Sequence, residues 1–274
     1  MRLRFALNRM CAPHMPFEQF AALAQRLGVD AIEIRNDLAQ VEMADGAPGE
    51  QIGVVARAHG LVIRSINALQ RFDEFDATRA AETRALIDYA LACGAQSLVL
   101  CPTNSLRDDR SPAERHDALV HALSELVPML AASGLTGLVE PLGFEECAVR
   151  RKSQAVRAMQ AVGSPACLAL VHDTFHHHLA GEALFFPQHT GLVHVSGVDD
   201  PALAPGAMRD GHRVLVGGAD QLGNAAQLAQ LLRAGYVGWV SFEPFADEIA
   251  QASDLAQRLQ ASMDHLRQAI GTPA

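Results

Sequence analysis

Short apolar runs alternate with helical stretches along the whole of the 274-residue chain. Apolar runs that are bounded by turn residues are typical of strands buried on both faces of a sheet. Eight such runs are predicted as strands: 3–7, 31–34, 61–66, 97–100, 137–139, 168–171, 192–195 and 237–242. Eight strands, each followed by a helical or loop segment, indicate a closed parallel barrel. We therefore predict a single (β/α)8 TIM barrel over residues 1–274, of the α/β class.

The segments between the strands carry helical periodicity, and several of these stripes stop at a glycine. The predicted stops are Gly28, Gly94, Gly134 and Gly271, and a kink is predicted at Pro128. The helix after the sixth strand must be short, because Pro187 interrupts the segment. An open doubly wound sheet is the alternative architecture, but the chain lacks a glycine-rich phosphate loop after its first strand.

Composition narrows the classes of function. Hydrophobic residues make up 49% and charged residues 19%, as in globular proteins. The formal net charge is -9 and no lysine and arginine block occurs, so we expect no nucleic-acid partner. No apolar run could cross a bilayer and no signal-peptide cleavage site is recognisable, so a cytoplasmic protein is expected. The 5 cysteines, without a C-x-x-C pair, suggest reduced thiols.

Ionisable residues stand where four consecutive predicted strands end. The runs Leu-Val-Glu-Pro, Leu-Val-His-Asp, Leu-Val-His-Val and Phe-Glu-Pro place Glu140, Asp173, His194 and Glu243 at these ends. Barrel enzymes build their sites at the C-terminal ends of strands, so the four side chains should converge. Each alone is explained as readily by a helix cap, a buried histidine or an ion pair with an arginine.

Together, the four residues predict a metal site. Ionisable side chains that meet at one barrel mouth would repel and desolvate one another unless a cation neutralised them. Three carboxylates and one imidazole suit one divalent ion of Mn, Mg, Co or Zn, and the lack of thiolates argues against a structural zinc site.

Other polar residues have two interpretations. His176 lies three residues after Asp173 and can face the same site, or it can belong to a surface histidine cluster with His177. Glu33 and Arg35 share one parity in the second strand, so both should point into the barrel, either to serve the site or to pair with each other. Asn67, at the end of the third strand, is a candidate to bind substrate hydroxyl groups.

The chain resembles the xylose-isomerase-like superfamily of sugar isomerases and epimerases, and within it the inosose isomerase (2-keto-myo-inositol isomerase) branch. The similar stretches cover nearly the whole chain: IEIR at 32–35, INAL at 66–69, EPLGF at 140–144, HDTFHHHLAG at 172–181, LVHV at 192–195 and VSFEPF at 240–245. The D-[ST]-F-H-x-H segment is the most specific of them.

The resemblance implies roles for individual residues. The metal ligands would be Glu140, Asp173, His194 and Glu243. The catalytic residues would be Glu140, Glu243, His176 and Arg213. Beside these, we predict from their positions that Glu33, Arg35, Asn67 and His178 bind the substrate. One departure leaves the role of Arg213 open: the family has a Pro-Gly-x-Gly turn after this arginine, and this chain has Val-Leu-Val-Gly-Gly at 214–218.

The implied activity is isomerisation or epimerisation of a small polyhydroxy ketone, an inosose or a ketose. In it, a proton moves between adjacent carbons through a cis-enediolate that a divalent metal stabilises. The most specific expectation is 2-keto-myo-inositol isomerase, which would place the chain in inositol catabolism. An endonuclease-IV-like phosphodiesterase and a non-catalytic, metal-dependent sugar-binding protein are the alternatives. The expected partner is a sugar or cyclitol ketone, without nucleic acid or membrane, and a homo-oligomer is left open.

Overall fold

Eight parallel strands close into a barrel in the computed structural model, which describes residues 3–39 and 41–271. The strands follow one another around the barrel in chain order, and β1 closes the ring by pairing with β8. They are β1 (Arg4–Asn8), β2 (Ala31–Arg35), β3 (Val62–Gln70), β4 (Ser97–Cys101), β5 (Thr136–Val139), β6 (Leu168–Asp173), β7 (Thr190–Val195) and β8 (Trp239–Phe242). The predicted (β/α)8 barrel is confirmed.

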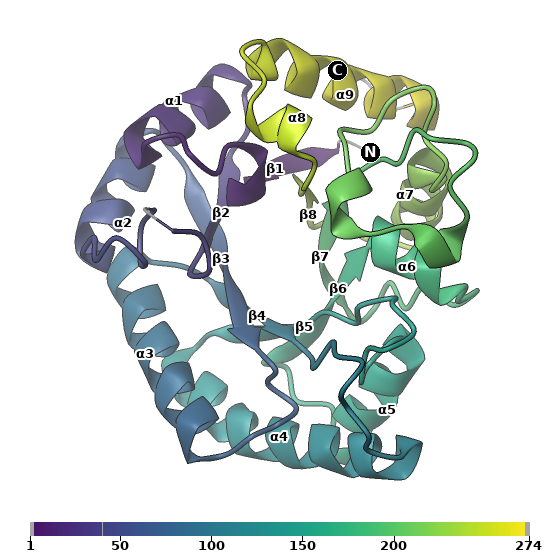
Figure 1. Ribbon diagram of the computed structural model, residues 1–274. Coiled ribbons are helices and arrows are strands. Elements are labelled where there is room, and N and C mark those ends of the chain that lie inside the picture. Colours follow the sequence, from purple (N-terminus) through teal and green to yellow (C-terminus); the bar gives the residue numbers. More distant parts are fainter. Residues whose placement is uncertain (1–2, 40, 272–274) are drawn as a thin grey trace.

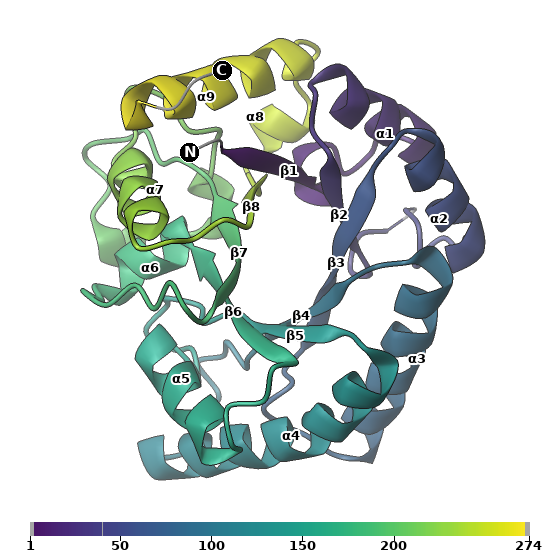
Figure 2. The ribbon, with the colours of Figure 1, turned by 180° about the vertical axis from the view of Figure 1, so that it is seen from behind.

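Helices form a ring outside the strands, and Figures 1 and 2 show this arrangement from opposite sides. They are α1 (Phe17–Arg26), α2 (Gly49–Ala58), α3 (Ala77–Cys93), α4 (Pro112–Ser133), α5 (Lys152–Ala161), α6 (Thr174–Ala180), α7 (Asn224–Arg233), α8 (Asp247–Ala250) and α9 (Leu255–Ile270). The glycine stops are confirmed at α3 and α4, which end at Gly94 and Gly134 with left-handed φ angles of 78° and 71°. In the described ranges, no helix is both long and apolar enough to cross a membrane.

Side chains alternate between the two faces of each strand, and this alternation determines which residues point into the barrel. Outward residues such as Leu170 and Val193 pack with the surrounding helices in one large core. A second cluster consists of residues that alternate with them on the strands: Ala68, Val99, Cys101, Leu138, Val171 and Leu192. Glu140, Asp173 and His194 each follow one of these residues by two positions. Their side chains therefore point the same way, one layer nearer the C-terminal end of the barrel.

Two connections on the C-terminal side of the barrel bring further groups to its mouth. α6 has only 7 residues, as the sequence required, and the Asp173 side chain caps it by accepting a hydrogen bond from the His176 backbone N–H at 3.0 Å. A long segment between β7 and α7 contains the short 3-10 helices η2 (Pro205–Ala207) and η3 (Asp210–His212). Arg213 follows η3 directly. Backbone hydrogen bonds between Gly197 and Val214 tie this segment to the end of β7.

Candidate metal centre

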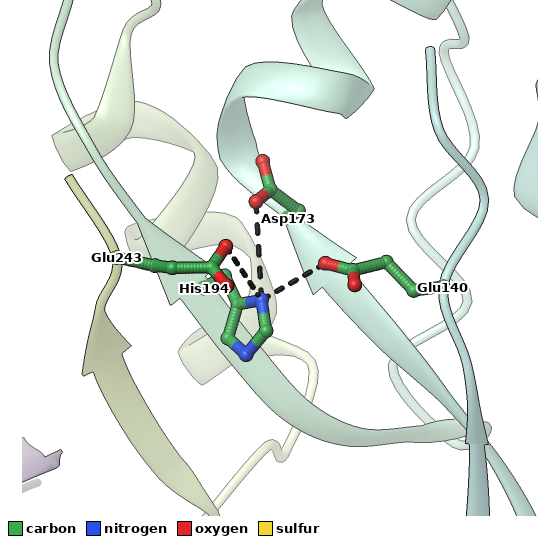
Figure 3. A group of neighbouring side chains, drawn as sticks. All are labelled: Glu140, Asp173, His194 and Glu243. Carbon is green, nitrogen blue, oxygen red and sulfur yellow. Dashed lines mark hydrogen bonds and ion pairs between the residues drawn. The ribbon is translucent and has the colours of Figure 1, made fainter. Parts of the chain in front are cut away.

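The four strand-end residues meet in the structure. One ligand atom from each of Glu140, Asp173, His194 and Glu243 can be chosen so that all lie within 4.8 Å of one another, and all four side chains are buried. The three carboxylates point at the same ring nitrogen of His194, while the other ring nitrogen points away from them (Figure 3). His194 Nδ1 lies 2.9 Å from Glu140 Oε1, 3.2 Å from Glu243 Oε2 and 3.9 Å from Asp173 Oδ2.

This arrangement fits a divalent ion. Burial alone would lower the pKa of His194, but Glu243, Glu33 and Glu140 raise it well above the usual value, so the carboxylates attract a positive charge at the ring. Three carboxylate oxygens and one imidazole nitrogen are ligands for zinc, manganese, cobalt or magnesium. A cation bound between the three carboxylates and His194 would supply the positive charge that a protonated His194 supplies in its absence.

Two buried arginines hold the carboxylates of the centre. Arg213 Nη2 donates to Asp173 Oδ2 at 2.7 Å and to Glu243 Oε2 at 3.0 Å. Arg35 Nη1 donates to Glu243 Oε1 at 2.9 Å. Burial would raise the pKa of Glu243, but His194, Arg213 and Arg35 lower it far below its usual range. Glu243 is therefore a firmly held carboxylate. The Glu140 side chain, among the described residues, accepts from His194 and, at 3.5 Å, from the thiol of Cys101.

A cavity of ≈ 320 Å³ adjoins the centre, and Glu140 and Glu243 form part of its wall. Two buried polar atoms of its lining have no hydrogen-bond partner, His176 Nδ1 and Asn67 Oδ1. The two residues line the cavity, and their imidazole and amide groups can bond the hydroxyl and carbonyl groups of a polar ligand. The lining residues are Arg35, Asn67, Gln70, Arg71, Cys101, Pro102, Asn104, Glu140, Leu142, Phe144, His176, Asp210, Arg213, Glu243 and Phe245.

The other residues singled out from the sequence divide into two groups. Arg35, Asn67, His176 and Arg213 line the cavity, whereas Glu33 and His178 do not. Glu33 is fully buried, with an exposed fraction of 0%. The role of Glu33 in substrate binding stays a prediction. His178 is half-buried on α6, away from the lining residues.

Glu33 and Arg35 do point into the barrel, but they do not pair with each other. Arg35 binds Asp37 through two hydrogen bonds of 2.8 and 2.7 Å, in addition to its contact with Glu243. Glu33 instead accepts from His194 Nε2 at 3.1 Å. Burial would raise the pKa of Glu33, but the attraction and hydrogen bond of His194 lower it to about 2. The alternative of a Glu33–Arg35 ion pair is wrong, because each side chain has a partner on another strand.

A second buried polar network contains Lys152, His172, His177 and Gln227. Lys152 Nζ lies 2.8 Å from His172 Nδ1 and 2.8 Å from His177 Nδ1. His172 Nε2 contacts Gln227 Oε1 at 2.9 Å. Burial lowers the pKa of Lys152 to about 7, and Glu182 and Asp173 oppose this shift only in part. His177 therefore lies in this network, while His176, its neighbour on α6, lines the cavity.

Asn8, Cys101 and Ser65 contact residues of the barrel interior and the metal centre and were not singled out in the sequence, although each has a signal there. Asn8 and Cys101 are the last residues of β1 and β4, so the rule that selected the four strand-end residues applies to them as well. Ser65 is a polar residue inside the third predicted strand, and burial of a hydroxyl in a strand requires a partner. That partner, Glu33, lies on the adjacent strand β2.

Gly143, in the loop after β5, allows this loop to approach α6. A Cβ atom at position 143 would collide with the backbone carbonyl of His176 and would stand 2.8 Å from Leu179 Cβ. We expect a Gly143→Ala variant to lose about 1–3 kcal/mol of unfolding free energy, as overpacking does elsewhere. Urea denaturation would measure the loss. Gly217→Ala is the matched control, since its Cβ would meet nothing within 4 Å, and equal stability of the two variants would contradict this packing.

Comparisons with known proteins support the family resemblance and the barrel fold. A family model described as the xylose isomerase-like TIM barrel matches residues 21–269. A xylose isomerase domain-containing protein from Salmonella typhimurium LT2 is 31% identical, with a TM-score of 0.86 over 99% of this chain and 98% of that one. No curated protein sequence gives a significant match.

Two more distant structures share the fold. The IolI protein, solved with a bound zinc atom, is 20% identical with a TM-score of 0.85, and the match covers 98% of each chain. D-psicose 3-epimerase from Clostridium cellulolyticum H10, solved with D-tagatose, is 15% identical with a TM-score of 0.77 over 98% of this chain and 99% of that one.

Proposed function

Because the chain belongs to the xylose isomerase-like TIM-barrel family, we propose that it is a divalent-metal-dependent isomerase or epimerase of a small polyhydroxy ketone, with 2-keto-myo-inositol as the first substrate to test. The observation that carries the proposal is the cluster of Glu140, Asp173, His194 and Glu243 in the wall of a cavity that also contains an unpaired histidine nitrogen. One zinc, manganese, cobalt or magnesium ion per chain would be held by these four residues. The zinc atom of the IolI structure makes zinc the first metal to test.

The charge of the cavity supports an uncharged substrate. Each arginine among the described lining residues is already paired with a carboxylate: Arg35 with Asp37 and Glu243, Arg71 with Glu74, and Arg213 with Asp173, Glu243 and Asp210. A phosphate or carboxylate group on the substrate would have to compete with these acids for a guanidinium group. A cyclitol or sugar ketone, which offers only hydroxyl and carbonyl groups, does not.

The proposed chemistry is a proton transfer from the hydroxyl-bearing carbon beside the ketone to the adjacent carbonyl carbon, through a cis-enediolate. A divalent ion supplies stabilisation of the negative charge that develops on the substrate oxygens. Glu140 and Glu243 reach the cavity from β5 and β8, so one carboxylate can take the proton from the substrate and the other can return one to the neighbouring carbon. His176 and Arg213 line the cavity, and their side chains can hold substrate oxygens in place.

Solvent exchange tests this chemistry. When the zinc-loaded protein is incubated with 2-keto-myo-inositol in deuterium oxide, we expect deuterium to enter at the carbon beside the ketone, because a carboxylate at a cavity wall can exchange its proton with water. Proton NMR would follow the label and the product together. A sugar-binding protein without turnover would give neither label nor product, and conversion with strict retention of the substrate's own hydrogen at every pH would indicate a hydride shift instead.

A further inference from the structure

Glu33 is an ionised carboxylate that neither the four-ligand cluster nor the cavity uses. It lies on β2 with 0% exposure, inside the barrel beside His194. Its two oxygens both lie 3.1 Å from His194 Nε2, the ring nitrogen that points away from the three metal-site carboxylates. The imidazole therefore stands between a carboxylate on one side and the metal centre on the other.

Three further donors hold the Glu33 carboxylate in this position. The Ser65 hydroxyl donates to Oε2 at 2.5 Å, and Asn67 Nδ2 donates to the same oxygen at 2.9 Å. Asn8 Nδ2 lies 3.3 Å from Oε1. These residues come from β1 and β3, the strands on either side of β2. The two amide nitrogens can only donate, one to each oxygen, and an ionised carboxylate accepts all of these hydrogen bonds at once.

Asn8 links Glu33 to Glu243, a second residue of the four-residue cluster. Its Oδ1 accepts a hydrogen bond from the Met10 backbone N–H at 3.0 Å, which fixes which way the amide group faces. Its Nδ2 then points at both Glu33 Oε1 and, at 3.1 Å, Glu243 Oε1. Glu33 and Asn8 thus connect His194 to Glu243 on the side away from the cavity.

We propose that Glu33 is a positioning residue for the metal centre, which holds the proton of His194 on Nε2 and so leaves Nδ1 free to bind the ion. The inference rests on the metal site of the proposed function. A neutral imidazole carries its proton on either nitrogen, and only the nitrogen without a proton can ligate a metal. A carboxylate beside Nε2 requires an N–H there, and it also fixes the plane of the ring.

The test is the metal affinity of a Glu33→Gln variant. The amide can turn its NH2 group toward Nε2 and select the other tautomer, in which Nδ1 carries the proton. We expect the dissociation constant for zinc, measured by competition with a chromophoric chelator, to rise about 10-fold to 100-fold, as loss of a partner behind a metal-binding histidine does elsewhere. The absorption spectrum of the cobalt-loaded protein should change as well, since the ring of His194 is no longer held.

Asp73→Asn is the matched control. Asp73 is also a buried carboxylate, with 1% exposure, and it accepts from the Thr103 backbone N–H at 2.6 Å and from Arg110 at 2.8 Å, outside the cavity lining. We expect this variant to lose stability without losing zinc affinity. Thermal melts of both metal-free variants separate stability from binding. Ser65→Ala, which keeps the Glu33 carboxylate but removes one of its donors, should weaken zinc binding by a smaller factor.

The outcomes separate this proposal from the proposed function. If the wild-type protein binds no divalent ion, the metal site itself fails. If the wild type binds zinc and a folded Glu33→Gln variant binds it equally well, with an unchanged cobalt spectrum, only the role of Glu33 is overturned. If Glu33→Gln does not fold, an unchanged zinc affinity of Ser65→Ala together with an unchanged cobalt spectrum overturns it.

Discussion

A Glu243→Gln variant is expected to stay folded, bind the divalent ion far more weakly and lose turnover by about 10²-fold to 10⁴-fold, the usual contribution of a positioned proton-transfer group. The substitution replaces a charged ligand with a neutral one and removes a carboxylate from the cavity wall. The fold should survive because each buried arginine keeps another acid. Arg35 retains Asp37, and Arg213 retains Asp173.

Metal content after dialysis, turnover and a thermal melt are the three measurements for this variant. The wild-type protein should carry about one equivalent of metal per chain. Glu125→Gln is the control, because Glu125 is an exposed residue of α4 and the substitution makes the same change of charge. Wild-type metal occupancy together with wild-type turnover in Glu243→Gln would remove Glu243 from the site.

A His176→Ala variant is expected to keep its metal but lose about 100-fold to 1,000-fold in turnover, the effect of removing one charge-stabilising donor from a dry site. His176 is not one of the four clustered residues, yet it lines the cavity, is 4% exposed and has a buried Nδ1 without a hydrogen-bond partner. The ring is held edge-on between Phe144 and Phe175, with centroids at 5.3 and 5.2 Å. A substrate oxygen is the partner that this geometry leaves open.

The control for His176→Ala is His177→Ala, which removes the next side chain of α6 from the Lys152 network instead of the cavity. We expect that variant to retain its metal and most of its turnover. Metal loss on His176→Ala would make His176 a ligand, and one of the four clustered residues would then have another role. Unchanged kinetics with the metal retained would leave the unpaired nitrogen without a function in the reaction.

The sequence was sufficient for the fold and for the convergence of the four strand-end residues. Both follow from local patterns, since apolar runs predict the strands and the C-terminal ends of parallel strands meet at one mouth. Placing Glu140, Asp173, His194 and Glu243 together needs no knowledge of register. The alternation of side chains along a strand was also sufficient to predict that Glu33 and Arg35 point into the barrel.

The partners of those inward residues could not be predicted in the same way. The contact of Glu33 with His194 crosses the barrel from β2 to β7, and the contact of Asn8 with Glu243 depends on the pairing of β1 with β8. Such contacts are fixed by the relative shift of the strands and the closure of the barrel, which no short sequence pattern encodes. The same holds for Arg213, which reaches the site from an irregular segment.

The metal centre draws its residues from both halves of the barrel, and this limits how the chain can be recombined with a relative. All four clustered residues belong to the second half of the barrel, at the ends of β5 to β8, and Arg213 of the same half holds two of them. Five further residues that orient them, directly or through Glu33, come from β1 to β3: Asn8, Glu33, Arg35, Ser65 and Asn67. Neither half contains a complete centre. Exchange of one half-barrel for that of a relative would therefore preserve the ligands and still disturb the affinity, unless the orienting residues were transferred with them.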